Sequence, residues 1–348
     1  MPTSYVAPAN NGTTGTKDGT YAIGALNYAD EYQRSLEQNF PWVLNYGALY
    51  ATPNNNRFRW VNSKTIEIPS ISTTGRVDAN RDTIAFAQRN YQNAWTPLTL
   101  ENERKWSTLV HPRDIDETNM VATIGNITQV FNEEHKFPEM DAYTISKIYA
   151  DWTSAVNPDT GVTLTPDTTV LTTQNILSVF DSLMLKMDNG RVPANGRILY
   201  VPFEVLYILK EAEKISRSMD ITSGPNAIDR RVNRLDQVQV IGVPSTLMKT
   251  LYEFTTDYAI ADDAEQINMF LVHPLAVITP VSYTFSRLDP PSAMSEGKYV
   301  YYEESFEDVF ILANKANAIQ FNVSNGGGTS TTTSTSTSTS TSTSTSTS

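Results

Sequence analysis

The sequence predicts an α+β fold, in which strands and helices follow one another without a strict β-α-β order. Residues 57–71 and 95–110 have β-strand patterns on either side of a polar stretch. Residues 115–135 repeat apolar residues at helical spacing, and short apolar runs separated by turn residues follow residue 198. The chain has 348 residues and is 40% hydrophobic, which is enough for a sizeable core.

The N-terminal region offers little regular pattern. Residues 1–20 are rich in Asn, Gly, Thr and Pro, so we expect a flexible arm without a secretion signal. Residues 26–51 form a mixed, weakly helical segment with Pro41 near its centre. The apolar residues of this segment are Leu26, Tyr32, Leu36, Phe40, Trp42, Val43, Leu44 and Leu49.

Residues 57–113 are expected to form one long, two-stranded excursion around the polar stretch 76–94. In the first strand Ile66, Ile68 and, after Pro69, Ile71 alternate with polar residues. In the second strand Leu98, Leu100 and Trp106 share a parity. This excursion has little core of its own. Because an isolated hairpin is barely stable in water, it must lie on its own domain or on a neighbour.

A helix is predicted over 115–135, because Val121, Ile124, Ile127, Val130 and Phe131 recur at steps of three and four. Acidic residues in its first turn suit the positive end of the helix dipole. Pro138 is expected to interrupt the pattern, and a second helix then runs to about Trp152.

The second half of the chain alternates between helices and short strands. A loop rich in Thr, Pro and Asp is expected over 153–173, and the last 23 residues are Gly, Ser and Thr only, which predicts a solvated tail. Helices are predicted over 174–188 and 202–215, and strands over 198–201, 238–243, 267–272, 277–285, 299–303, 308–312 and 318–323.

The composition narrows the possible chemistry. The chain has no cysteine and three histidines, which leaves few options for zinc sites or for Ser-His-Asp catalysis. We find no phosphate-binding loop, nucleophile elbow or dinucleotide fingerprint. The cluster His111–Glu117 holds three acids and a histidine, but helix N-terminal charges explain it better than a metal does. We therefore expect no enzyme activity, no metal and no cofactor.

The charge is unevenly distributed. The net charge of −12 argues against a dedicated nucleic-acid binder, although not against a protein that encloses nucleic acid. Residues 57–113 carry nine bases and five acids, a net +4, whereas residues 114–160 carry two bases and nine acids, a net −7. Either these segments face each other, within a chain or between copies, or they are two solvated surfaces of different charge.

A group of motifs between residues 91 and 150 resembles the major capsid proteins of siphophages that infect Gram-positive bacteria, which share the HK97-like shell fold. The motifs are the strand Leu98–Trp106, Asp114-Ile115-Asp116-Glu117-Thr118, Phe131-Asn132-Glu133 and Pro138-Glu139-Met140-Asp141-Ala142-Tyr143. Gly242-Val243-Pro244, Phe270–Pro274 and Tyr299-Val300-Tyr301-Tyr302 are similar to later strands of that family more loosely. The resemblance covers roughly residues 25–323.

The resemblance implies a division of the chain that agrees with the pattern analysis. Its parts are an N-terminal arm at 1–55, an E-loop hairpin at 56–113, a peripheral domain with a long spine helix at 114–190, an axial domain at 191–285, a return to the peripheral domain at 286–325 and a Ser/Thr-rich tail at 326–348. Only about 55 residues precede the E-loop, so we expect a separate scaffold protein or none.

The same resemblance implies a structural shell protein that self-assembles into the hexamers and pentamers of an icosahedral phage head around double-stranded DNA. It would reside in the virion, and in the host cytoplasm during assembly, with possible scaffold, portal and decoration proteins as partners and no membrane contact. The alternatives are an encapsulin-type compartment, a soluble hydrolase that uses the acidic clusters, and a cell-surface module on a Ser/Thr stalk.

In that family the E-loop of one subunit lies across the peripheral domain of its neighbour. This implies that the basic segment 57–113 of one copy contacts the acidic segment 114–160 of an adjacent copy. The candidate basic contacts are Arg76, Arg81, Arg89, Arg104 and Lys105, and the candidate acidic partners are Asp116, Glu117, Glu133 and Glu134.

Overall fold

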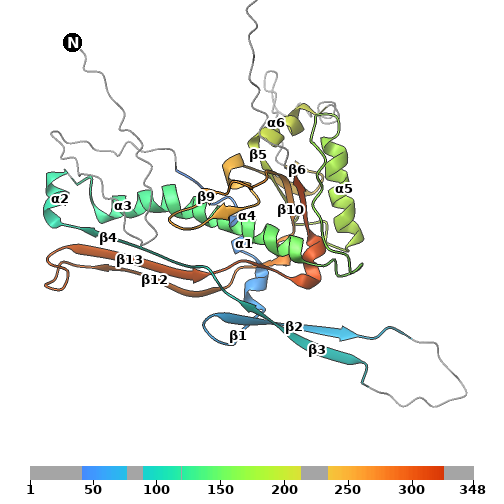
Figure 1. Cartoon of the computed structure of the whole chain (residues 1–348), viewed down its shortest axis with the longest axis horizontal. Coiled ribbons are helices and arrows are strands. Elements are labelled where there is room, and N and C mark those ends of the chain that lie inside the picture. The colour runs from blue at the N-terminus through green and yellow to red at the C-terminus, as the bar shows by residue number, and fades with distance from the viewer. Residues whose placement is uncertain (1–40, 77–88, 119, 213–233, 325–348) are drawn as a thin grey trace, which may run out of the picture.

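The computed structural model describes residues 41–76, 89–118, 120–212 and 234–324. Figure 1 shows three parts: a compact sheet-and-helix unit, a long flat part in which helices lie along a three-stranded sheet, and a hairpin that projects away from both. The predictions for residues 1–40, 77–88 (which include Arg81), 213–215 and 326–348 concern residues outside the described part of the chain.

The compact unit is built on a five-stranded sheet with the order β15-β10-β5-β7-β6. Strands β5 and β7 are parallel, and the other neighbours are antiparallel. All residues of β5 and β15 are buried. β5 is a continuous apolar strand, as expected for a strand covered on both faces, whereas the buried Gln320 and Asn322 of β15 donate hydrogen bonds to neighbouring segments. The strands are β5 (Ile198–Pro202), β6 (Arg234–Leu235), β7 (Val238–Val243), β10 (Ile267–Val272) and β15 (Ile319–Val323).

Three helices complete the main core. They are α4 (Phe137–Ser154), α5 (Ile176–Asn189) and α6 (Phe203–Glu211), and each buries one apolar stripe. A row of rings crosses the core, in which Phe270 stacks on Phe321 with ring centroids 4.8 Å apart and Trp152 meets Phe321 at 5.1 Å. Most helices and strands predicted for 174–323 are confirmed, with shifts of a few residues at their ends. The single strand predicted over 277–285 is wrong, because it is divided into β11 (Val277–Ile278) and β12 (Val281–Asp289), which pair with different strands. The last residues of the helix predicted over 202–215 lie outside the described residues.

The flat part is a sheet of β12 (Val281–Asp289), β13 (Tyr299–Glu307) and β4 (Glu103–Val110), with β13 in the middle and antiparallel to both neighbours. The α-helices α2 (Pro112–Glu117), α3 (Ile124–Phe131) and α4 run beside it (Figure 1).

The helix predicted over 115–135 differs from the observed helices in two ways: it is broken near its start, and it does not end at residue 135. The helical path is broken between Glu117 and Thr123, and Thr123 then begins α3 by accepting a hydrogen bond from the backbone N–H of Asn126. The predicted interruption at Pro138 is wrong: α3 continues through a π turn, η2 (Asn132–Lys136), into α4. The wider π turn directly precedes the proline, which lacks the N–H that an α-helical bond would need.

The projecting hairpin consists of β2 (Thr65–Thr73) and β3 (Tyr91–Thr99), with the short strand β1 (Arg59–Trp60) on the other side of β2. The expectation that 95–110 forms a single strand of this hairpin is wrong. The strand ends at Thr99, and β4 pairs with β13 in the flat part instead. Likewise β15, from the range predicted to return to the peripheral sheet, is an edge of the five-stranded sheet.

A small second core joins the hairpin to the body. It consists of the buried residues Ile66, Leu100, Ile278, Phe306 and Phe310. The buried carboxylate of Asp308 adds polar links, since it accepts hydrogen bonds from the backbone N–H of Glu101 and the hydroxyl of Tyr143, each at 2.8 Å.

The remaining short elements tie the chain segments together. Segment 41–56 is held on α4 by Asp141, whose buried carboxylate accepts the backbone N–H groups of Asn45 at 2.9 Å and Tyr46 at 3.1 Å. The short elements are α1 (Gly47–Tyr50), η1 (Pro53–Asn56), η3 (Ser245–Leu247), β8 (Tyr252–Glu253), β9 (Ala259–Ile260), η4 (Pro274–Ala276), β11 (Val277–Ile278), β14 (Phe310–Ile311) and η5 (Ala313–Ala318).

Candidate assembly surfaces

The two faces of the β2–β3 hairpin have opposite environments. In the antiparallel register Ile66 lies opposite Leu98, and Ile66 is fully buried in the small core. Pro69 opposite Trp95, and Thr73 opposite Tyr91, belong to the other face, because neighbouring residues of a strand point to opposite sides.

This second face, the free hairpin face, carries exposed apolar side chains. Ile71 is 73% exposed, and Tyr91 and Trp95 are also exposed. The guanidinium of Arg59 lies 4.7 Å from the centre of the Trp95 ring, which holds the tryptophan in place while leaving much of it open. Exposed apolar residues gathered on one face of a strand pair commonly mark a protein–protein contact.

The flat sheet also has two different faces. The face toward the helices is filled by Trp106, which stacks on Phe131 with centroids 3.9 Å apart and an angle of 7° between the rings. Two ion pairs lie on the same side: Arg104 with Glu139 at 2.5 Å, and Lys136 with Glu303.

The opposite face of this sheet, the outer sheet face, presents a row of aromatic rings to solvent. Tyr283 stacks on Phe285 with ring centroids 6.3 Å apart, and Phe285 lies 6.1 Å from Tyr302. Tyr283 and Phe285 are exposed. Lys105 and Glu304 are opposite each other in the register on this face. The outer sheet face is therefore a second surface suited to contact with another chain.

Three of the charged residues predicted to make contacts already have partners within the chain. Arg104 pairs with Glu139 and also donates to the carbonyl of Phe254 at 3.2 Å. Glu117 pairs with Arg113 one helical turn away. Glu133 accepts a hydrogen bond from Gln129 at 3.0 Å.

The other predicted residues are more open. Arg76 and Arg89 are exposed and lie at the same end of the hairpin, just after β2 and just before β3. Lys105 and Asp116 are exposed, Glu134 is half-buried, and Arg81 lies outside the described residues. The structure brings none of the described basic candidates into an ion pair with any of the four acidic candidates in this chain.

The exposed rings were not singled out as contact residues from the sequence. Tyr91 and Trp95 share a parity with each other and not with Leu98, which is a period-2 signal that their face differs from the buried one. Tyr283 and Phe285 show the same parity in β12.

Two titratable groups connect the α3–η2–α4 helix with its surroundings. His135 lies 2.6 Å from Asp257, and this hydrogen bond raises the pKa of His135 against the opposing effect of partial burial. Burial raises the pKa of Asp141 to about 6, although the hydrogen bonds from Asn45 and Tyr46 favour its charged form.

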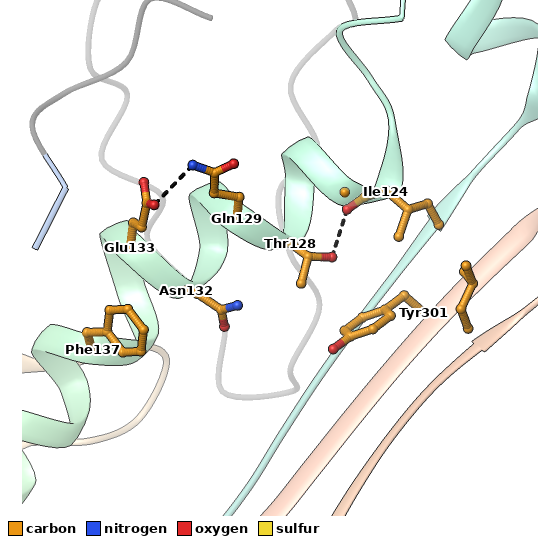
Figure 2. Close-up of a pocket in the computed structure, with 9 residues that line it drawn as sticks. Ile124, Thr128, Gln129, Asn132, Glu133, Phe137 and Tyr301 are labelled. Atoms are coloured by element: carbon orange, nitrogen blue, oxygen red, sulfur yellow. Dashed lines mark hydrogen bonds between the residues drawn. The ribbon is translucent and has the colours of Figure 1, made fainter. Parts of the chain in front are cut away.

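A groove of about 580 Å³ separates α3 and η2 from the flat sheet. Figure 2 shows Thr128 and Asn132 on the side of the helix that faces the strand carrying Tyr301. Its lining is Ile124, Gly125, Thr128, Gln129, Asn132, Glu133, Phe137, Leu288 and Tyr301, a largely apolar set. The side-chain oxygen of Asn132 is buried and has no hydrogen-bond partner among the described residues.

Within the described residues, no group of three or more His, Asp or Glu side chains is arranged to hold a metal ion. The helices in this part of the chain are also too short or too polar to cross a membrane.

The chain shares its architecture with capsid proteins of solved phage structures. It superimposes with a TM-score of 0.60 on the bacteriophage PhiM1 mature capsid, at 11% identity, covering 90% of this chain and 96% of the other. For the cyanophage P-SCSP1u capsid the TM-score is 0.59 at 12% identity, covering 93% and 100%. For a chain from Mycobacterium phage Che8 it is 0.57 at 12% identity, covering 86% and 98%.

These likenesses show the fold: the chain has the α+β, HK97-like fold of phage capsid proteins, as predicted from the sequence. A comparison with protein-family models finds no match. A comparison with curated proteins finds no match either.

Proposed function

We propose that this chain is a major capsid protein, the non-enzymatic subunit that forms the icosahedral head of a tailed phage. The observation that carries the proposal is a hairpin anchored on one face by Ile66 and open on the other through Ile71, Tyr91 and Trp95, on a fold shared with phage capsid chains. A monomer gains nothing from that open apolar face, whereas a neighbour that covers it removes apolar surface from water.

The proposal includes hexamers and pentamers as the units of the shell, double-stranded DNA as its content and the virion as its location. Scaffold, portal and decoration proteins are further proposed partners. The net charge of −12 supports enclosure of DNA without sequence-specific binding, because dedicated binding needs clustered Lys and Arg.

We assign the hairpin to the E-loop, the α3–η2–α4 helix with the flat sheet to the peripheral domain, and the five-stranded sheet with α5 and α6 to the axial domain. The N-terminal arm and the tail complete the proposed division. In this assignment β4 belongs with the peripheral domain and β15 with the axial domain, because that is where they pair.

The direct test is assembly. The purified full-length chain, alone and with a candidate scaffold protein, should form closed particles that are visible by electron microscopy and that sediment in the megadalton range. A protein that stays monomeric under both conditions contradicts the proposal. Particles isolated from cells should contain DNA, and a packaged enzyme in its place indicates an encapsulin-type compartment.

We further propose that the basic side chains near the hairpin tip contact acidic side chains of an adjacent copy. Arg76 and Arg89 are exposed, and Arg76, Arg81 and Arg89 can be reversed together to Glu. Each exposed pair contributes only about 0–1 kcal/mol, but a shell repeats the contact many times. Assembly should weaken at low salt while the circular dichroism of the subunit stays unchanged, and the defect should shrink as salt rises.

The matched control replaces the same three arginines by lysine, which keeps the charge, and should assemble as the parent does. Normal assembly of the Glu variant at low salt would show that the two oppositely charged segments are only solvated surfaces.

A further inference from the structure

The groove beside α3 is largely apolar and open to solvent. Its walls are the side chains of Ile124, Phe137, Leu288 and Tyr301, and its volume of about 580 Å³ has room for several apolar side chains. Gly125 also lines it, and a Cβ placed there meets no atom within 4 Å. The groove is open to solvent, so an apolar segment that covered it would remove these apolar walls from water.

The groove also offers one polar group. Figure 2 shows Asn132 pointing from the helix toward the strands, and its buried oxygen lacks a donor among the described residues. A buried acceptor without a partner is costly, so the occupant should bring an N–H or O–H donor together with its apolar side chains. A peptide segment provides both.

The chain itself delivers such a segment to one end of the groove. The backbone N–H of Trp42 donates to the carbonyl of Glu133 at 3.2 Å, and Glu133 lines the groove. Phe40 is only two residues away, a reach of about 7 Å at most. The residues that precede Trp42 therefore start beside Glu133, near the Phe137 end of the groove.

The sequence of this segment matches the chemistry of the groove. Leu26, Ala29, Tyr32, Leu36 and Phe40 follow one another at steps of three, three, four and four, with polar residues between them. The Tyr32 hydroxyl and the backbone N–H groups are donors.

The length matches as well. The groove runs along the helix from Phe137 to Gly125, about 18 Å at the helical rise. Residues 26–40 cover about 21 Å as a helix, and six extended residues cover about 20 Å. The segment can therefore reach the far end of the groove in either conformation.

We propose that residues 26–40 of the same chain occupy the groove between α3 and the flat sheet, with Phe40 and Leu36 against its apolar walls. This contact completes the peripheral core and fixes the direction in which the N-terminal region leaves the subunit. It does not depend on the shell function, since it is a contact within one subunit.

The test is a photo-crosslink from position 40. Benzoylphenylalanine at position 40 is a mild substitution in the full-length protein, because the residue it replaces is Phe. After irradiation of an equal mixture of ¹⁴N- and ¹⁵N-labelled subunits, mass spectrometry should find crosslinks to residues 124–137 or 281–307, with both peptides carrying the same isotope. The same probe in place of Tyr5 should give no groove crosslinks.

Two outcomes of the crosslink from position 40 overturn the proposal. Mixed-isotope crosslinks would show that the segment of another copy fills the groove, and absence of groove crosslinks would show that residues 26–40 lie elsewhere. As a second arm, Gly125→Leu fills the groove from its wall and should lower the crosslink yield several-fold. An unchanged yield in a folded Gly125→Leu protein also contradicts the proposal.

Discussion

Ile66 and Ile71 lie on the same strand, β2, but on opposite faces, and this makes them a matched pair for a test of what each face does. Ile66 is fully buried in the small core, whereas Ile71 is 73% exposed on the free hairpin face. Replacing either by Ala removes the same atoms and leaves the same strand. The two variants should therefore differ only through the environment of the lost side chain.

Ile66→Ala should lower the free energy of unfolding of the subunit. Truncation of a buried Ile to Ala costs about 2–5 kcal/mol, from lost apolar burial and from the cavity left behind. The small core contains only five buried residues and lies at the edge of the body, so its walls can relax. We therefore expect a loss of about 2–3 kcal/mol, measured by urea denaturation of the unassembled subunit at fixed protein concentration.

Ile71→Ala should change the free energy of unfolding by less than about 0.5 kcal/mol, as for most exposed sites. The substitution should instead weaken assembly, because a neighbouring subunit can cover the exposed side chain of Ile71. Light scattering of assembling subunits should show a higher critical concentration for Ile71→Ala than for the parent.

Each of these two predictions has a result that would contradict it. If Ile66→Ala unfolds at the same urea concentration as the parent, the small core does not anchor the hairpin. If Ile71→Ala assembles at the parent's critical concentration, the free hairpin face is not a contact surface.

The remaining predictions concern charge and the tail. Arg104→Ala should lower the free energy of unfolding by about 1–3 kcal/mol at pH 7, because it leaves the carboxylate of Glu139 without its cation. Burial raises the pKa of Glu139 and Arg104 lowers it, so this loss should shrink as the pH falls toward about 4 and the carboxylate is protonated. Urea denaturation at several pH values measures the loss. The raised pKa of His135 means that its pairing with Asp257 stabilises the fold below about pH 6.5 and is lost as the pH rises through the raised pKa. Proton NMR of the histidine ring should give a lower midpoint in Asp257→Asn. Truncation after Asn325 should leave the thermal stability and shell formation intact, because only Gly, Ser and Thr follow, and loss of folded protein would contradict this.

The sequence predicted the elements whose pattern is local. Apolar runs such as Ile198–Pro202 and Ile267–Val272 are strands, and the helix of residues 176–189 ends just before Gly190 as its Asn-Gly signal indicates. The extended hairpin with little core of its own was also predictable, because alternation of Ile66 and Ile68 with polar residues is a strand signal that needs no partner.

The pairing of strands that are distant in the sequence could not be predicted from the local pattern of apolar residues. Leu98, Leu100 and Trp106 share a parity, and this suggested one strand with one buried face. In the structure Leu100 belongs to the small core and Leu98 packs against it, whereas Trp106 stacks on Phe131 of α3. The change of partner occurs between Thr99 and Glu103, where Asp308 accepts the backbone N–H of Glu101.

The same limit explains why Arg104 was predicted to contact another copy. Arg104 was grouped with Lys105 because both belong to a basic segment, yet neighbours on a strand point to opposite faces. Arg104 therefore meets Glu139 of its own chain, and Lys105 remains exposed on the outer sheet face. An ion pair already made within the chain resists exchange for one between copies, because breaking it leaves a half-buried carboxylate unpaired. Charge composition thus indicates which segment of the chain is basic or acidic. The face of the sheet on which each residue lies decides which of these charged side chains are exposed to a neighbouring copy.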